Sequence, residues 1–182
     1  LTFRGGFARA NAESDIFSFT TGLLTLERAD FDGVNYGGEV AVWVSPRFDI
    51  TLGVDHASAS RRSEFRDWVD QDDLPIQQTT DFSRTPLTVG VKAYLLPRGR
   101  SIGQFAWVPA RFAPYAGIAA GSMRYRFVQE GDFVDFDDPD FAVFYDLFES
   151  SGWTPTAQGV AGFDLALSPR IALTTEGKYA WA

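Results

Sequence analysis

Residues 40–54 read VAVWVSPRFDITLGV, and this stretch contains the pattern that decides the fold. On both sides of Ser45-Pro46-Arg47, apolar residues occupy every second position, from Val40 to Val44 and again from Phe48 to Val54. Period-2 alternation is typical of a strand with two different faces. Proline beside small polar residues is typical of a tight turn. The stretch therefore predicts a β-hairpin with a short basic turn.

The same signature recurs along the chain. Residues 163–177 repeat it around Ser168-Pro169-Arg170, and a looser copy at 89–121 contains Pro97-Arg98 and Pro109-Ala110-Arg111. Seven strands are expected in all: 2–9, 34–44, 48–58, 83–96, 111–127, 153–167 and 170–181. The segments at about 10–33, 59–81 and 129–152 are expected as long loops. Strands joined alternately by short turns and long loops predict one all-β domain, residues 1–182, folded as an antiparallel up-and-down β-barrel.

The amino-acid composition excludes several kinds of site. The chain has 182 residues, 15% of them aromatic, and no cysteine. Disulfides, thiolate zinc sites and cysteine nucleophiles are therefore excluded, and no metal or cofactor is expected. The apolar runs are only a few residues long, whereas a membrane-spanning helix needs about 20.

Charge is distributed unevenly along the chain, whose net charge is −8. The three expected loops contain nineteen acids and four bases, so the remainder of the chain is net basic. Five arginines fall in or beside the short turns: Arg47, Arg98, Arg100, Arg111 and Arg170. One pole of the barrel is thus expected to be acidic and the other basic. Nucleic-acid binding is not expected, because it needs an exposed basic face.

The two faces of the predicted strands differ in chemistry. One is apolar, and the other carries nine charged residues: Arg4, Glu39, Asp49, Asp55, Arg84, Lys92, Asp164, Glu176 and Lys178. In a soluble barrel these charges would point to solvent, whereas a membrane barrel places apolar residues on lipid and polar ones inside. Five acids and four bases are close to balance, which favours paired charges in a lumen. Trp43, Tyr94 and Tyr115 are expected to fill the remaining space, leaving no open channel. Aromatic residues near the strand ends, among them Phe105, Trp153 and Trp181, match the girdles of membrane barrels.

The turns at 44–48 and 167–171, together with the strand 111–121 (RFAPYAGIAAG), carry a family resemblance. The chain resembles the small outer-membrane β-barrels of the OmpA/OmpX type over essentially its whole length. The resemblance implies eight strands, a place in the bacterial outer membrane and contact with outer-membrane lipids. Since only seven strands are visible in the sequence, a further loop and a closing strand are expected to be missing from it.

The long segments offer candidates for contact with a partner. Ser14 or Asp15 could cap a short helix with Ile16, Phe19 and Leu23 on one face, and residues 65–69 show helical spacing. The segment 129–152 combines eight acids with many aromatic residues, which suggests a contact surface for an extracellular protein. Oxygen-rich clusters suit Ca²⁺, but 135–140 lacks the pattern of an EF-hand loop, so ion binding there stays open.

The preferred function is therefore non-enzymatic: a structural or surface-binding protein of the outer membrane. Two alternatives remain. His56 and Ser58 could act as a base and nucleophile in a lipid-modifying hydrolase, because such pairs activate serine. The pair is similar to the His-x-Ser of lipid A deacylase barrels, although it lies on the third strand and is followed by Ala59. The other alternative is a soluble up-and-down barrel that binds an apolar ligand.

Overall fold

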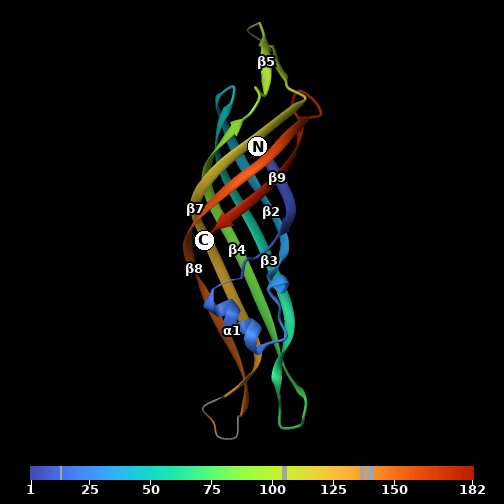
Figure 1. Ribbon diagram of the computed structural model, residues 1–182, viewed down its shortest axis with the longest axis vertical. Helices are drawn as coiled ribbons and strands as arrows, with labels where there is room; N and C mark the ends of the chain where they lie inside the picture. The colour runs from blue at the N-terminus through green and yellow to red at the C-terminus, as the bar shows by residue number, and fades with distance from the viewer. Residues whose placement is uncertain (13, 104–105, 136–137, 139–141) are drawn as a thin grey trace.

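The protein is a long, curved antiparallel sheet, seen in a computed structural model that describes all residues except 13, 104, 105, 136, 137 and 139–141 (Figure 1). Seven strands lie side by side in chain order: β1 (Thr2–Ala8), β2 (Gly33–Ser45), β3 (Phe48–Val69), β4 (Pro75–Tyr94), β7 (Phe112–Val134), β8 (Val143–Ala166) and β9 (Ala172–Trp181). Two of the three connections at one end, 46–47 and 167–171, are short. The expected antiparallel up-and-down sheet of seven strands is confirmed.

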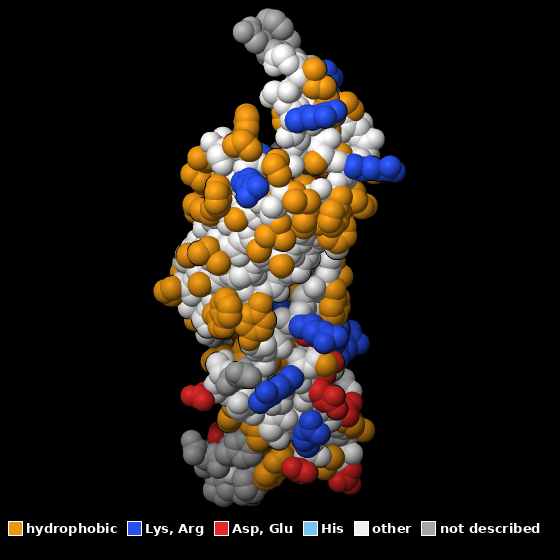
Figure 2. Space-filling view, turned by 45° about the horizontal axis from the view of Figure 1, so that its top comes forward, with side chains coloured by type: hydrophobic (Ala, Val, Ile, Leu, Met, Phe, Trp, Pro, Cys, Tyr) orange, Lys and Arg blue, Asp and Glu red, His pale blue; other side chains and the backbone are white. Residues whose placement is uncertain are grey.

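In the half of the sheet nearer the short turns, paired strands place their side chains alternately on two distinct faces. Leu52 on β3 lies opposite Val89 on β4, which lies opposite Ala120 on β7, so these side chains share the outer, convex face. Residues one position away, such as Thr88, point to the inner, concave face and are buried. The convex face carries apolar side chains that are about half exposed: Val40, Val42, Ile50, Leu52, Val54, Leu87, Val89, Val91 and Ile118. We call them the apolar belt, and Figure 2 shows one side of it.

The strands run much further than the sequence pattern indicated. Most of 59–81 and 129–152 is strand rather than loop, because β3 and β4 are joined only by 70–74, and β7 and β8 by 135–142. The helical spacing expected at 65–69 was wrong, since these residues belong to β3. The cluster of acids at 135–140 falls largely on residues outside the description, as does the aromatic Phe105.

These strand extensions are held by an apolar cluster on their concave face. Its buried members are Ala12, Leu24, Leu26, Phe31, Phe65, Ile76, Phe127 and Val134. In this half large apolar side chains point inward, unlike at the belt, although the polar Ser63, Gln78 and Thr80 are buried on this face as well. Burial of apolar area stabilises such a cluster by about 25 cal/mol per Å².

The segment 10–33 covers this cluster. It contains the expected helix, α1 (Asp15–Leu23), which begins after Ser14, and a 3-10 turn, η1 (Arg28–Phe31). Figure 1 shows α1 lying across the extended strands. Phe17 packs edge-on against the rings of Phe31 and Phe82. Phe19, expected on the packed face of the helix, is instead exposed.

At the opposite end the looser hairpin copy forms an arm that the sequence did not predict. Between β4 and β7, the strands β5 (Gly99–Ile102) and β6 (Ala106–Pro109) pair only with each other. They project beyond the sheet at the top of Figure 1. We call this end, with its short connections, the turn end.

Within the described residues β1 and β9 are not hydrogen-bonded to each other, so the sheet is not closed into a barrel. Six consecutive antiparallel pairings make β1 and β9 run in the same direction. Side chains nevertheless bridge the seam, because Arg4 Nη1 lies 3.4 Å from Glu176 Oε1.

Replacement of the buried Leu24 should detach the segment 10–33 from the extensions. Leu24 is only 1% exposed and its backbone bridges to Phe65. We expect Leu24→Ala to cost about 3 kcal/mol of local packing, a typical loss for a buried leucine. Limited proteolysis should then cut within 10–33 far faster than in the parent. Phe19→Ala is the matched control. Equal cleavage rates in all three proteins would contradict the packing described here.

Candidate functional site

Six charged side chains meet on the concave face beneath the apolar belt. They come from five strands: Arg4 on β1, Glu39 on β2, Asp55 on β3, Lys92 on β4, and Glu176 with Lys178 on β9. We call these six residues the ion cluster. It contains three bases and three acids, so its formal charge is zero. The first and last strands both contribute to it.

The contacts within the ion cluster are short and shared. Arg4 donates from Nε to Asp55 Oδ1 at 2.7 Å and from Nη1 to Glu39 Oε2 at 3.1 Å. Lys92 Nζ lies 2.6 Å from Glu39 Oε1 and 2.8 Å from Glu176 Oε2. Lys178 Nζ donates to Asp55 Oδ2 at 2.8 Å. Each carboxylate therefore faces at least two cations, the arrangement that makes buried charge tolerable.

Small residues provide the space for these long side chains. A Cβ on Gly37 would lie 2.3 Å from Asp55 Oδ1, and one on Gly53 would lie 2.9 Å from Arg4 Nη2. Any larger residue at Gly37 would push directly against the carboxylate. The concave face thus alternates large charged residues with glycine, in agreement with the close packing of protein interiors.

Two tyrosines border the ion cluster. Tyr115 donates from its hydroxyl to Glu176 Oε2 at 2.6 Å, and Lys92 Nζ lies 4.7 Å from the centre of its ring. Tyr94 packs against Tyr115 and donates to Asp164 at 3.1 Å. Both side chains point into the concave face, as expected from their strand positions. Trp43, also expected inside, is 59% exposed, although its strand partner Asp49 is buried.

The other three charges expected inside lie apart from the cluster. Asp49 is 1% exposed and contacts Arg98, whose Nη1 lies 2.8 Å away. Asp164 accepts hydrogen bonds from Tyr94 and from Thr174 Oγ1, the latter at 2.7 Å. Arg84 donates to the backbone carbonyl of Arg9. Sequence reasoning missed Arg98, because it follows Pro97 in a segment that looks like an ordinary basic turn.

The pair His56 and Ser58 lies on the convex face just beyond the apolar belt. His56 Nδ1 is 2.8 Å from Thr85 Oγ1, and its ring packs on Tyr36. In the part of the chain that the structure describes, no hydrogen bond joins His56 to Ser58. Ser58 instead lines a shallow hollow with Ser60, Asp81, Ser83 and Arg126, among others. The geometry gives Ser58 no contact with a base that would activate it.

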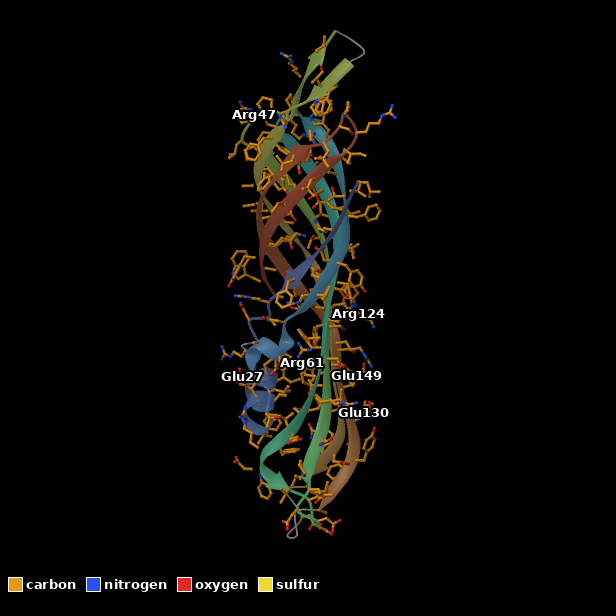
Figure 3. All side chains as sticks on the ribbon, turned by 90° about the vertical axis from the view of Figure 1, so that its right-hand side faces the viewer. Glu27, Arg47, Arg61, Arg124, Glu130 and Glu149 are labelled. Atoms are coloured by element: carbon orange, nitrogen blue, oxygen red, sulfur yellow. The ribbon has the colours of Figure 1, made fainter. Side chains whose placement is uncertain are left out.

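The outer face of the extensions is polar and charged, as Figure 3 illustrates with Arg124, Glu130 and Glu149. Arg126 donates from Nε to Glu149 Oε1 at 2.8 Å, and this hydrogen bond lowers the pKa of the Glu149 carboxyl from its usual 4.5. The contribution of the pair is therefore complete above the unfolded pKa and is lost as the pH falls through the lower folded pKa. Such exposed pairs stabilise only weakly.

Among the described residues, no group of three or more His, Asp or Glu side chains is placed to hold a metal ion. No helix among these residues is long and apolar enough to cross a membrane. Comparisons with protein-family models, curated proteins and solved structures found no match.

Removal of one partner from the ion cluster should destabilise the fold strongly. Arg4→Met leaves the cluster with two bases and three acids, and a buried pair broken on one side costs about 3 kcal/mol or more. We expect the midpoint of denaturant unfolding to fall accordingly. Arg62→Met, an exposed arginine on β3, is the matched control and should be close to neutral. Equal midpoints for the two variants would mean that the cluster contributes little.

Proposed function

We propose that this protein is a transmembrane β-barrel of a bacterial outer membrane, of the OmpA/OmpX type, with a structural or surface-binding role. The observation that carries the proposal is the pairing of an outward apolar belt with an inward ion cluster at the same level of the sheet. Water would be a poor solvent for that belt, and a lipid would be a poor neighbour for that cluster.

The dimensions of the belt support this proposal. Around the belt, the convex face of β7 is apolar over nine residues, from Phe112 to Ala120, and Ser122 and Arg124 follow on the same face; the matching stretch of β3, Phe48 to Val54, has seven. Tilted strands of roughly 9–11 residues span a bilayer. Aromatic side chains lie at the edge of the belt near the extensions, among them Tyr36, Trp153, Tyr179 and Trp181, all more than half exposed. Such residues favour the membrane–water interface.

In a bilayer, the backbone groups on the free edges of β1 and β9 would need hydrogen-bond partners, because unsatisfied backbone groups in hydrocarbon cost several kcal/mol each. One more strand, antiparallel to both neighbours, would close the sheet with ordinary antiparallel pairing. Eight strands enclose a lumen that side chains can just fill. We include an eighth strand in the proposal for this reason.

The extensions support a role in surface contact. Beyond Ala157, the partner of Trp181, β8 has no neighbour on its outer side within the described sheet. That free edge carries exposed Phe144, Tyr145, Leu147 and Phe148. Exposed apolar residues on an unpaired strand suit contact with an extracellular protein.

Spin labels can test the membrane assignment, since the chain has no cysteine of its own. We expect labels at Leu52→Cys, Val89→Cys and Ile118→Cys in reconstituted protein to be accessible to oxygen and shielded from a water-soluble nickel reagent. Thr79→Cys, on the same face of β4 but beyond the belt, should show the reverse. Nickel accessibility at all four positions would overturn the proposal.

The ion cluster should also prevent steady conduction. Its side chains extend from five strands and fill the concave face, with Glu39, Asp55, Lys92 and Glu176 only 8% exposed. We therefore expect no lasting single-channel current from the purified protein in planar bilayers. A stable current that changes its ion selectivity in Glu39→Gln would indicate an open pore lined by the cluster instead.

A further inference from the structure

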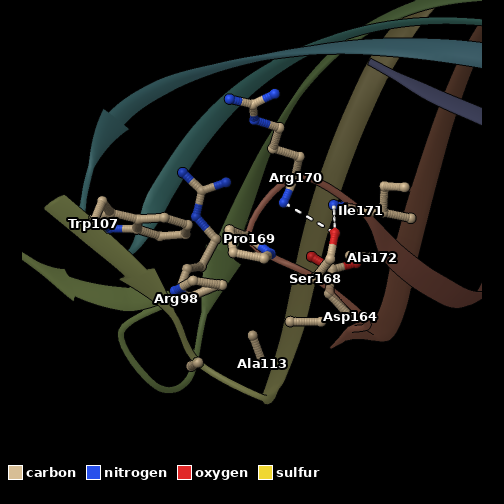
Figure 4. A pocket seen from close by; sticks show the side chains of 12 residues that line it. Arg98, Trp107, Ala113, Asp164, Ser168, Pro169, Arg170, Ile171 and Ala172 are labelled. Atoms are coloured by element: carbon tan, nitrogen blue, oxygen red, sulfur yellow. Dashed lines mark hydrogen bonds between the residues drawn. The ribbon is translucent and has the colours of Figure 1, made fainter.

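A small hollow opens at the turn end, between the β5–β6 arm and the turn that joins β8 to β9. Its volume is about 200 Å³. This is below the range of pockets for drug-sized ligands, so it fits a ligand with a single ring whose substituents can extend into solvent. Figure 4 shows Trp107 and Arg98 on one side and Ser168 with Arg170 on the other.

Each wall offers a different kind of contact. Trp107 presents an indole that is 46% exposed, and a Cβ on Gly99 would lie only 2.5 Å from it, so the glycine allows the ring to lie flat across the arm. Ser168 Oγ accepts hydrogen bonds from the backbone N–H groups of Arg170 and Ile171, which leaves its own proton free to donate. The floor consists of small side chains, including Ala113 and Ala166.

The charges around the hollow favour an anion. Asp164, the one acid among the described residues that line it, already accepts hydrogen bonds from the hydroxyl groups of Tyr94 and Thr174. Arg170 is exposed, and no ion pair joins it to another described residue. A guanidinium recognises a carboxylate through two parallel N–H···O contacts. The rest of this end is basic as well, which would attract anions from solution.

The position of the hollow argues for a water-borne ligand rather than a lipid headgroup. Ala113, Asp164 and Ala172 line it, and all three belong to the concave face. The apolar side chains that could hold acyl chains lie on the convex face, on the other side of the sheet.

We propose that this hollow binds a sugar that carries a carboxylate. The sugar ring lies on the indole of Trp107, an amphipathic surface that suits a ligand with an apolar face and polar edges. The carboxylate pairs with Arg170, and Ser168 donates a hydrogen bond to it. This inference is independent of the membrane assignment, since it uses only residues at the turn end.

Calorimetric titration of the full chain in detergent tests the site, with N-acetylmuramic acid as the probe. N-acetylglucosamine has the same ring without the carboxylate, and inorganic phosphate is an anion without a ring. We expect saturable binding of the acidic sugar alone. Arg170→Gln should weaken it about tenfold or more, in line with loss of a charged hydrogen bond. Trp107→Leu should weaken it comparably.

Arg100→Gln is the matched control, because Arg100 lies in the same arm but pairs with Val108 on the face opposite to Trp107. It should leave the affinity unchanged. Circular dichroism of each variant establishes that the sheet is intact. Equal binding of the two sugars, binding of phosphate as tight as that of the acidic sugar, or equal losses in Arg100→Gln and Arg170→Gln would each overturn the proposal.

Discussion

The structure depends on one electrostatic constraint: charges removed from water on the concave face must be compensated there. The ion cluster meets it with three cations and three carboxylates, of which Arg4 reaches three partners across the sheet. Because its members come from β1, β2, β3, β4 and β9, the cluster specifies the curvature of the sheet as well as its register. A flatter sheet would separate Glu176 from Lys92 and leave each of them with fewer opposite charges around it. Directional contacts of this kind select one arrangement more sharply than apolar packing does.

The face of the sheet that carries the apolar side chains changes partway along the same strands. On β4, the convex face is apolar from Leu87 to Ala93 and polar from Gln77 to Thr85, while the concave face carries Lys92 in the first part and the apolar Phe82 and Ile76, beside Thr80 and Gln78, in the second. The alternation continues through the change without a break, so a single pleated strand serves two environments. The helix α1 is needed only in the second of them, where it covers the apolar cluster.

Much of this architecture can be predicted from the sequence, and the exceptions have physical reasons. Alternation around Pro46 and Pro169 revealed the hairpins and both faces of the belt, and the balance of charges indicated that those residues pair. The extensions escaped detection because their outward side chains, such as Arg62 and Thr79, look like those of a loop. The apolar positions that alternate with them are too widely scattered in the sequence to stand out. Arg98 was missed because nothing in the local pattern says that a turn residue folds back onto Asp49.

The length of the extensions has a consequence for long-range forces. More than ten residues of β3 follow Val54 before the tip at 70–74, where Asp70, Asp72 and Asp73 are found. At about 3.3 Å per residue, residues 55–69 extend on the order of 50 Å along the strand. The Debye length at physiological ionic strength is about 8 Å. The carboxylates of the tip thus lie several Debye lengths from the belt. Counter-ions would therefore screen them from an anionic surface at the level of the belt. In the membrane setting proposed above, the negative tips could extend outward without being repelled by an anionic lipid surface.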